Sequence, residues 1–285
     1  MNSSRGPGVR TRTMVLDFAT YAILALGAIM MVLPFLWMIA TSFKLPADQF
    51  TKTLIPHPAT LANFRELWGH LPFPRLMWNS FLLSVLNVVG QLLTCSMGAF
   101  VFAVARFRGR NLLFTLLMVT LMIPSQVTLI PNFIIFRYMG VLGTQVPLWL
   151  PAFWGGAFGT FLLRQFFLTV PRDLADAARV DGASLLGIYW RVYLPLAKPA
   201  LAALSIFTFM WTWNDLLHPL VYLPTDMNKT TLTVGLAFFQ QQLAQGGKFT
   251  VLMSGALISI LPLIAVFFIA QRQFVEGIAL TGVKR

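Results

Sequence analysis

Few residues in this sequence have the types and spacing needed for catalysis or metal binding. The three histidines, His57, His70 and His218, are isolated and show no ligand spacing, which argues against a metal site. No Ser-His-Asp set or pair of carboxylates indicates hydrolysis, and no Gly-x-x-x-x-Gly-Lys-Ser/Thr loop is present to hold phosphates. The sequence therefore predicts a protein that is not an enzyme and that has no cofactor of its own.

Polar residues inside apolar stretches are the other candidates for function. Polar groups are costly in hydrocarbon, so those kept at mid-depth are candidates for a solute pathway. At mid-depth they are Gln91, Ser125 and Gln126. Pro124 and Pro131 could bend the stretch that holds two of them, as a gate requires. Trp213, Asn214 and Asp215 are expected toward the outer interface, where an aromatic face with a nearby amide and carboxylate could contact a solute. These residues could instead have structural roles: the polar groups could form hydrogen bonds to neighbouring helices, and the tryptophan could belong to an aromatic belt at the membrane surface.

The segment 171–195 predicts two short helices set at an angle. Pro171 can open the first helix, and Gly182 can end it because glycine adopts positive φ. Small side chains in that helix favour helix formation and let another surface approach the backbone. They are Ala175, Ala177 and Ala178. Ser184 is placed to cap the second helix, and Pro195 is expected to end it. A helical hairpin that only connects two spans is the alternative.

The composition indicates that a membrane positions these residues. Hydrophobic residues make up 57% and charged residues 11% of the 285 residues, and the mean hydropathy is +0.74. A soluble chain carries roughly a quarter charged residues. Here the apolar residues form runs long enough to cross a bilayer as helices, for which about 20 residues are needed. We expect an all-α protein with six spans, near residues 15–43, 79–105, 111–136, 146–168, 198–223 and 250–271.

The basic residues predict the orientation. The net charge is +12, but Lys and Arg flank the apolar runs instead of forming a face for nucleic acid. With the N-terminus inside, twice as many fall on the inner side as on the outer side. The inner residues are Arg5, Arg10, Arg12, Arg106, Arg108, Arg110, Arg164, Arg172, Arg179, Arg191, Lys198, Arg272, Lys284 and Arg285. This predicts a multi-pass protein of a bacterial inner membrane with both termini in the cytoplasm.

Two outer segments stand out. Residues 44–78 contain five prolines and predict a loop with short helical pieces. Residues 224–249 are polar and glutamine-rich, and they predict a second loop. No internal repeat supports a secondary carrier built from inverted repeats.

The segment 171–195 resembles the EAA loop of ABC importer permeases. That pattern is Glu-Ala-Ala, a glycine after three residues and Ile-x-Leu-Pro after nine more. The matching residues here, with both gaps kept, are Asp176, Ala177, Ala178, Gly182, Val192, Tyr193, Leu194 and Pro195. Asp176 replaces Glu and Val192 replaces Ile, and each keeps its chemistry.

The resemblance extends along most of the chain to carbohydrate importers. The runs 33–44 and 273–284 and the triplet Trp213, Asn214 and Asp215 are similar to those of the maltose-type second permease subunit. The resemblance implies the type I permease fold, with residues 1–285 as a single transmembrane domain and 171–195 as a cytoplasmic coupling loop. It also implies a second permease subunit, two ATP-binding subunits that hold ATP and Mg²⁺, and an extracytoplasmic sugar-binding protein.

The resemblance also implies roles for individual residues. The docking patch for the ATPase would be Asp176, Ala177, Ala178, Arg179, Asp181, Gly182 and Ala183. The segment 224–249 corresponds in position to a loop that enters the binding protein, and its candidate residues are Gln240, Gln241, Gln242, Gln245, Gly246 and Gly247. A solvated loop is the alternative.

Two other functions remain open at this stage. The same machine could carry a non-sugar solute such as glycerol phosphate or a polyamine, or the chain could be a stand-alone secondary carrier. Asp215 is the only acid deep in a predicted span, and a charged solute would require more charges of opposite sign. The sequence therefore favours a neutral or weakly charged solute.

Overall fold

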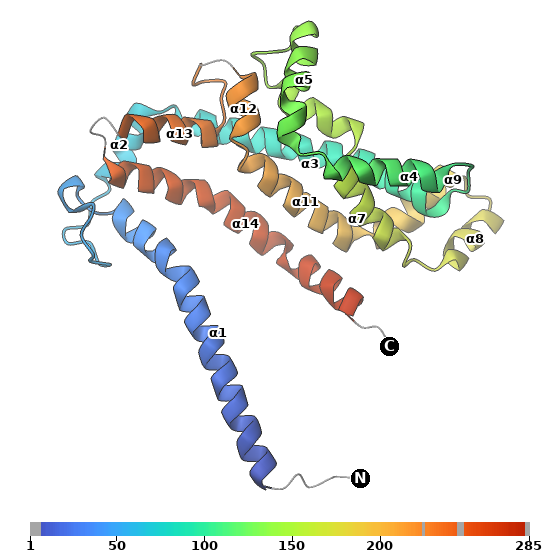
Figure 1. The fold of residues 1–285 in the computed structure, drawn as a ribbon, viewed down its shortest axis with the longest axis horizontal. Coiled ribbons are helices and arrows are strands. Elements are labelled where there is room, and N and C mark those ends of the chain that lie inside the picture. Colours follow the sequence, from blue (N-terminus) through green and yellow to red (C-terminus); the bar gives the residue numbers. More distant parts are fainter. Residues whose placement is uncertain (1–6, 224–225, 244–247, 283–285) are drawn as a thin grey trace. The chain divides into compact units, whose positions relative to one another are not determined.

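The computed structural model describes residues 7–223, 226–243 and 248–282 (Figure 1). All regular secondary structure in these residues is helical, which confirms the predicted all-α class. The chain forms two compact units. One comprises Met1–His70 and Gln242–Ile258, and the other Leu71–Gln241 and Ser259–Arg285.

The buried side-chain amide of Asn63 connects the helices of the first unit. Its helices are α1 (Pro7–Ser42), the short 3₁₀ helix η1 (Pro46–Asp48), α2 (Ala62–His70) and the start of α14 (Phe249–Gly282). The Asn63 side chain donates to the carbonyl oxygens of Ser42, at 2.9 Å, and Lys44, at 2.8 Å. Its own oxygen accepts from the Thr250 hydroxyl at 3.0 Å. Asn63 thus joins the end of α1 to α2 and to the first turn of α14.

The second unit holds the remaining helices. They are α3 (Phe73–Val104), α4 (Arg110–Val119), η2 (Thr120–Met122), α5 (Ser125–Tyr138), α6 (Val146–Trp149), η3 (Leu150–Trp154), α7 (Ala157–Phe167), α8 (Arg172–Val180), α9 (Leu185–Ile188), the π-helical turn η4 (Tyr189–Tyr193), α10 (Leu194–Leu196), α11 (Lys198–Trp213), α12 (Leu217–Tyr222) and α13 (Leu232–Leu243).

Four helical segments are long and apolar enough to cross a membrane, and two bent pairs raise the number to six if each pair is one span. The four are Leu16–Ser42, Phe73–Val104, Val146–Phe167 and Phe249–Ile269. Within the described residues, the predicted number of spans therefore agrees with the structure when the bent pairs are counted.

The predicted span 111–136 is wrong as a continuous helix. Its two halves, Arg110–Met122 and Ser125–Tyr138, are bent by 99°. The break falls at Ile123 and Pro124, where Ile123 is extended with ψ 114°. Proline disfavours helical geometry in the residue before it and lacks an N–H to continue the ladder. Pro124 therefore breaks this segment instead of kinking it gently.

The predicted span 198–223 is also interrupted. Its helix α11 ends at Trp213, and α12 begins only at Leu217, so Asn214 and Asp215 lie in the break. At its other end, α11 meets Leu185–Leu196 at an angle of 77°. A polar Asn-Asp pair favours a helix end because such side chains compete for backbone hydrogen bonds.

Helix α3 is the centre of the second unit and packs against α7 and α11. Helix α3 also packs against η3, and the approach is close at Gly90, where an added Cβ would lie 2.9 Å from Cδ2 of Phe153. It is also close at Gly159, where a Cβ would lie 2.8 Å from the Cys95 sulfur. Glycine at these two positions lets the helices meet with little space between them.

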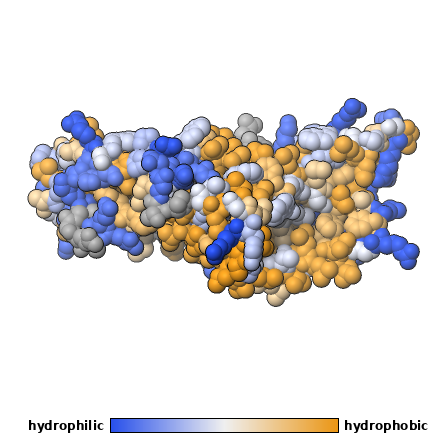
Figure 2. Space-filling model, turned by 90° about the horizontal axis from the view of Figure 1, so that it is seen from above, coloured by the Kyte–Doolittle hydropathy of each residue, from blue (hydrophilic) through white to orange (hydrophobic). Residues whose placement is uncertain are grey.

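Large apolar side chains remain exposed along the spans, and Figure 2 shows them gathered in broad patches on the surface. Met122 is 81% exposed and Phe18 77% exposed. Soluble monomers rarely expose large contiguous apolar patches, whereas helices in a bilayer cover theirs with lipid. The surface thus fits the membrane placement predicted from composition.

Candidate transport pathway and coupling surface

The segment 171–195 contains the helices that its sequence predicts. Pro171 immediately precedes α8, and Gly182 follows it with φ of +79°, in the left-handed region that glycine tolerates. The Ser184 side chain then accepts a hydrogen bond from the backbone N–H of Gly187 at 3.1 Å and caps α9. These three local predictions are confirmed.

The prediction that Pro195 ends the second helix is wrong by one residue. The helical path continues through α10 to Leu196, and Ala197 forms the boundary. The π-helical turn η4 lies directly before the proline, and the N–H of Leu194 bonds to the carbonyl of Tyr189 in a wider loop. Such a turn changes the local hydrogen-bond pattern, so the missing N–H of Pro195 is tolerated inside the helix.

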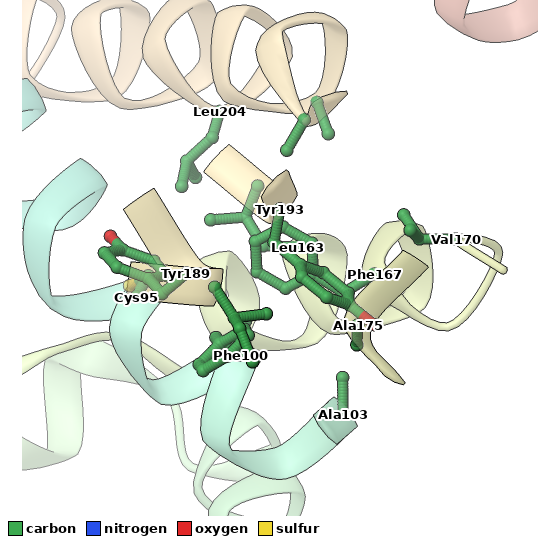
Figure 3. Close-up of a cluster of buried hydrophobic side chains, with 14 residues drawn as sticks. Cys95, Phe100, Ala103, Leu163, Phe167, Val170, Ala175, Tyr189, Tyr193 and Leu204 are labelled. Atoms are coloured by element: carbon green, nitrogen blue, oxygen red, sulfur yellow. The ribbon is translucent and has the colours of Figure 1, made fainter. Parts of the chain in front are cut away.

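Two of the three small side chains of α8, Ala175 and Ala178, face the chain's own core. Ala175 is 3% exposed and belongs to the buried cluster that includes Phe167 and Tyr193 (Figure 3), and Ala178 is packed against the same cluster. The alanines thus let α8 approach its own chain closely, a use that the sequence analysis did not foresee. Ala177 lies on the exposed side of the helix.

The outer side of this segment combines exposed apolar groups with charges. The exposed large apolar side chains are Leu174, Val180, Leu185, Leu186 and Trp190, of which Val180 is 88% exposed. Asp176, Asp181 and Gly182 are exposed on the same segment. The Arg179 guanidinium donates to the Asp176 carboxylate at 2.7 Å, and both side chains are largely exposed. Exposed pairs of this kind add little stability, so their charges remain available to a partner.

A hollow of about 270 Å³ lies at the turn between α8 and α9. It is lined by Ala178, Asp181, Gly182, Ala183, Gly187, Arg191 and Val192. The candidate docking residues Asp181, Gly182 and Ala183 therefore share one concave surface. We define the exposed residues of this segment together with the hollow as the coupling surface.

A larger cleft of about 470 Å³ lies among helices of the second unit. Its lining comes from α3, α5, α6, η3, α11 and α12, from Asp215 in the break between α11 and α12, and from Thr231 just before α13. The residues are Leu83, Asn87, Ser125, Thr128, Asn132, Phe136, Pro147, Leu148, Pro151, Trp211, Thr212, Asp215, His218, Pro219, Tyr222 and Thr231. We call this the polar cleft.

Uncharged hydrogen-bonding groups and aromatic rings dominate the lining of the polar cleft. Its charged or titratable pair is Asp215 and His218, whose Oδ2 and Nδ1 atoms are 2.9 Å apart. The Asn87 amide donates to the carbonyl oxygen of Leu148 at 3.0 Å, which leaves its side-chain oxygen as an acceptor. The buried Thr231 hydroxyl has no partner in the described part of the chain. Such an unsatisfied group is costly unless water or a ligand bonds to it.

Two of the six predicted pathway residues, Ser125 and Asp215, line the polar cleft. The others have other positions. Trp213 is buried, stacks on Phe209 and donates through its indole N–H to the carbonyl of Ser259 at 3.2 Å. Trp213 therefore packs between helices and does not line the polar cleft.

The remaining three predicted pathway residues lie outside the lining of this cleft. Gln91 accepts a hydrogen bond from the Cys95 thiol at 2.9 Å, and Asn214 donates to the carbonyl of Met210 at 2.8 Å. Gln126 is exposed. Each of these two hydrogen bonds joins residues four positions apart in the chain, whereas the alternative given in the sequence analysis was a bond to a neighbouring helix.

Several residues that line the polar cleft were not predicted from the sequence, although a helical repeat marks them. Ser125, Thr128 and Asn132 are three and seven residues apart, so they share one face of α5 once Pro124 is taken as its start. Likewise, Asp215 and His218 are three residues apart around the start of α12.

The predicted loop 224–249 is partly wrong, since α13 occupies Leu232–Leu243. Its apolar residues Leu232, Val234 and Phe239 are buried, and this packing stabilises a helix that a polar composition did not suggest. Gln240, Gln241 and Gln242 lie exposed near its end. Gln245, Gly246 and Gly247 lie outside the described residues.

Across the described residues, no group of three or more His, Cys, Asp or Glu side chains could hold a metal ion.

Comparison with known proteins agrees with these features. Residues 92–279 match the family described as the binding-protein-dependent transport system inner membrane component. The sn-glycerol-3-phosphate transport system permease protein UgpE of Yersinia enterocolitica is 31% identical over 271 residues, covering 92% of this chain and 96% of that one. The arabinooligosaccharides transport system permease protein AraQ of Halalkalibacterium halodurans is 35% identical over 266 residues, covering 90% and 92%.

A solved structure is also similar. A chain of a bacterial ABC transporter involved in the import of the acidic polysaccharide alginate has a TM-score of 0.80 and 25% identity, covering 96% of this chain and 100% of that one. The sequence matches and the shared fold span nearly the whole molecule. The chain is a multi-pass membrane transport subunit and belongs to the family of binding-protein-dependent transport system inner membrane components.

Proposed function

We propose that this chain is the permease subunit of an ATP-driven ABC importer that carries a neutral sugar into a bacterial cell. The importer would also contain a second permease subunit, two ATP-binding subunits that hold ATP and Mg²⁺, and an extracytoplasmic binding protein. Both termini and the coupling surface would face the cytoplasm. The chain itself would not hydrolyse ATP.

The proposed solute is inferred from the residues that line the polar cleft. The exposed Trp211 side chain offers a ring face for the C–H groups of a sugar, while hydroxyls and amides of the lining offer partners for its hydroxyls. No Lys or Arg occurs in this lining, and Asp215 already pairs with His218. An anion such as glycerol phosphate or a sugar acid, or a polyamine, would find no free opposite charge there.

The relatives and the solved structure differ in the class and the charge of the solutes for which they are named. One of them is named for arabinooligosaccharides, one for sn-glycerol-3-phosphate, and the solved importer carries alginate. The absence of lysine and arginine from the cleft lining favours the neutral member of this set. Direct uptake measurements distinguish them. Vesicles that contain the whole importer should take up a labelled neutral oligosaccharide, whereas preferred uptake of glycerol 3-phosphate would contradict the proposal.

The coupling surface would transmit the closure of the ATP-binding subunits to the permease. Its exposed apolar side chains, such as Val180, would seat in a cleft of the ATPase, and the exposed carboxylates would meet basic groups there. ATP would then bias a switch between two packings of the permease helices.

A matched pair of glycine variants tests this role. Gly182 has φ of +79° and Gly140 φ of +71°, and a Cβ at either would meet no atom within 4 Å. Valine at each position therefore brings similar backbone strain, of about 1–2 kcal/mol. Gly182→Val should abolish ATP-driven uptake with normal membrane insertion, whereas Gly140→Val should keep most of it. Uptake retained in Gly182→Val would instead favour a stand-alone carrier.

A further inference from the structure

A third concave surface, distinct from the polar cleft and from the hollow between α8 and α9, is strongly basic. It has a volume of about 440 Å³ and lies between the α3–α4 connection and the start of α8. Its lining residues are Arg106, Phe107, Gly109, Arg110, Asn111, Leu112 and Arg172. Three arginines thus surround one hollow whose lining contains no carboxylate. We call it the basic cleft.

The charges of the basic cleft are not balanced within the described chain. None of Arg106, Arg110 and Arg172 has a described carboxylate within 4.0 Å. A smaller adjoining hollow shares these arginines and adds one acid, Asp176, but that carboxylate is already paired with Arg179 at 2.7 Å. Like charges held around one hollow repel one another, so an anion entering it would be stabilised.

The rim of the basic cleft is apolar. Leu112 is 64% exposed, and the large side chains of Phe107 and Leu168 near the same hollows are also exposed. Phe107 and Leu168 lie just after the apolar spans that end with α3 and α7, and Leu112 lies in α4, which continues from the cleft with further exposed leucines. The cleft therefore adjoins surface that is suited to hydrocarbon.

We propose that the basic cleft binds the phosphate headgroup of an anionic phospholipid, with its acyl chains against the exposed leucines of α4. Guanidinium groups present planar forks of N–H donors that match phosphate oxygens in charge and geometry. Basic pockets at the membrane surface are suited to such headgroups. Free phosphate shares the headgroup chemistry, but only a lipid also covers the apolar rim.

The chain provides a matched control for this proposal. Arg108 lies in the same short connection as Arg106 and is likewise exposed, but it lines neither hollow. Arg106 and Arg172 are the informative residues, because both are exposed and neither makes a hydrogen bond to the described chain that a glutamine would remove. Arg110 is less suitable because it donates to the carbonyl of Ala105 at 3.3 Å.

The experiment uses the full chain purified in a neutral detergent. Short-chain phosphatidylglycerol, phosphatidylcholine or inorganic phosphate is added, and the shift in unfolding temperature gives the half-saturating concentration of each. Phosphatidylglycerol should stabilise the natural chain far more than phosphatidylcholine. Arg106→Gln and Arg172→Gln should each weaken phosphatidylglycerol binding about fivefold, and Arg108→Gln should not.

Four results would overturn the proposal. Equal stabilisation by the two lipids would show that the headgroup charge is not recognised. Equal losses in Arg106→Gln and Arg108→Gln would show that only the general charge of the connection matters. Saturation by inorganic phosphate at the same concentration as phosphatidylglycerol would assign the cleft to free phosphate. Unchanged lipid binding, with weaker association of the ATP-binding subunits in Arg172→Gln, would assign it to an acidic protein surface.

Discussion

The carboxylate of Asp215 and the imidazole of His218 lie 2.9 Å apart, between Oδ2 and Nδ1, at the break between α11 and α12. The other carboxylate oxygen accepts from the backbone N–H of His218 at 3.3 Å. Asp215 thus fixes the first turn of α12 and at the same time places a charged group in the lining of the polar cleft. Asp215 both bonds to the start of α12 and pairs with the His218 side chain. A change at Asp215 would therefore alter the shape of the cleft and its polarity together.

Replacing Asp215 by Asn tests its part in solute recognition. Asparagine keeps the size and an acceptor for the His218 N–H but removes the charge, and hydrogen bonds to charged groups are worth about 1.5–3 kcal/mol. We expect KM for the transported sugar to rise about tenfold or more, with unchanged amounts of protein in the membrane.

The matched substitution is Asp226→Asn, an exposed acid outside the lining of the polar cleft. It should leave KM unchanged in the same uptake assay. If Asp215→Asn transports the sugar with the natural KM, the polar cleft does not hold the solute through this group.

Replacing Gly90 by Val tests the close packing of the second unit. An added Cβ would lie 2.9 Å from Cδ2 of Phe153 and 3.0 Å from the backbone carbon of Ala152. Since backbone cannot yield as a flexible side chain does, we expect a loss of about 1–3 kcal/mol in the free energy of unfolding. Thermal unfolding of the purified chain in detergent measures it.

Gly27→Val is the control for overpacking, because a Cβ at Gly27 meets no atom within 4 Å. Its unfolding temperature should stay close to that of the natural chain. If the unfolding temperature falls equally in both variants, valine destabilises any span, and the close fit at Gly90 is not the cause of the lost stability.

Glu66 makes the first unit sensitive to acid. The hydrogen bond from Lys248, at 2.8 Å, holds the pKa of the Glu66 carboxyl below its ordinary value of 4.5, against the opposing effect of burial. Because the folded state lowers this pKa, the stabilisation is complete above the ordinary value and is lost as the pH falls through the lowered one. Both side chains are partly exposed, so the contribution is less than about 1 kcal/mol.

Unfolding temperatures measured from neutral pH down to below 4.5 check this expectation. The natural chain should lose more stability over that interval than Glu66→Gln, which lacks the ionisable group. Asp17→Asn, which removes an exposed acid from α1, should follow the natural chain. Parallel pH curves for Glu66→Gln and the natural chain would exclude this ion pair as the cause.

The sequence alone determined the features that depend on neighbouring residues or on average hydrophobicity. Apolar runs of span length predict the membrane helices because each backbone polar group in lipid must be bonded within its own helix. Pro171, Gly182 and Ser184 predict the ends of α8 and α9, since helix ends depend on one or two residues and their local hydrogen bonds. The spacing of the EAA-like segment also indicated the family.

Tertiary structure alone decided which side chains share a surface. Ser125 and Asp215 line one cleft because the chain turns by 99° between Met122 and Ser125 and because α11 ends at Trp213. A hydropathy pattern does not reveal either break. Trp213 looked like a pathway residue but packs on Phe209, since only the three-dimensional arrangement determines which side of a helix has neighbours. The same reason applies to Ala175, whose small side chain admits Tyr193 and Phe167 of its own chain.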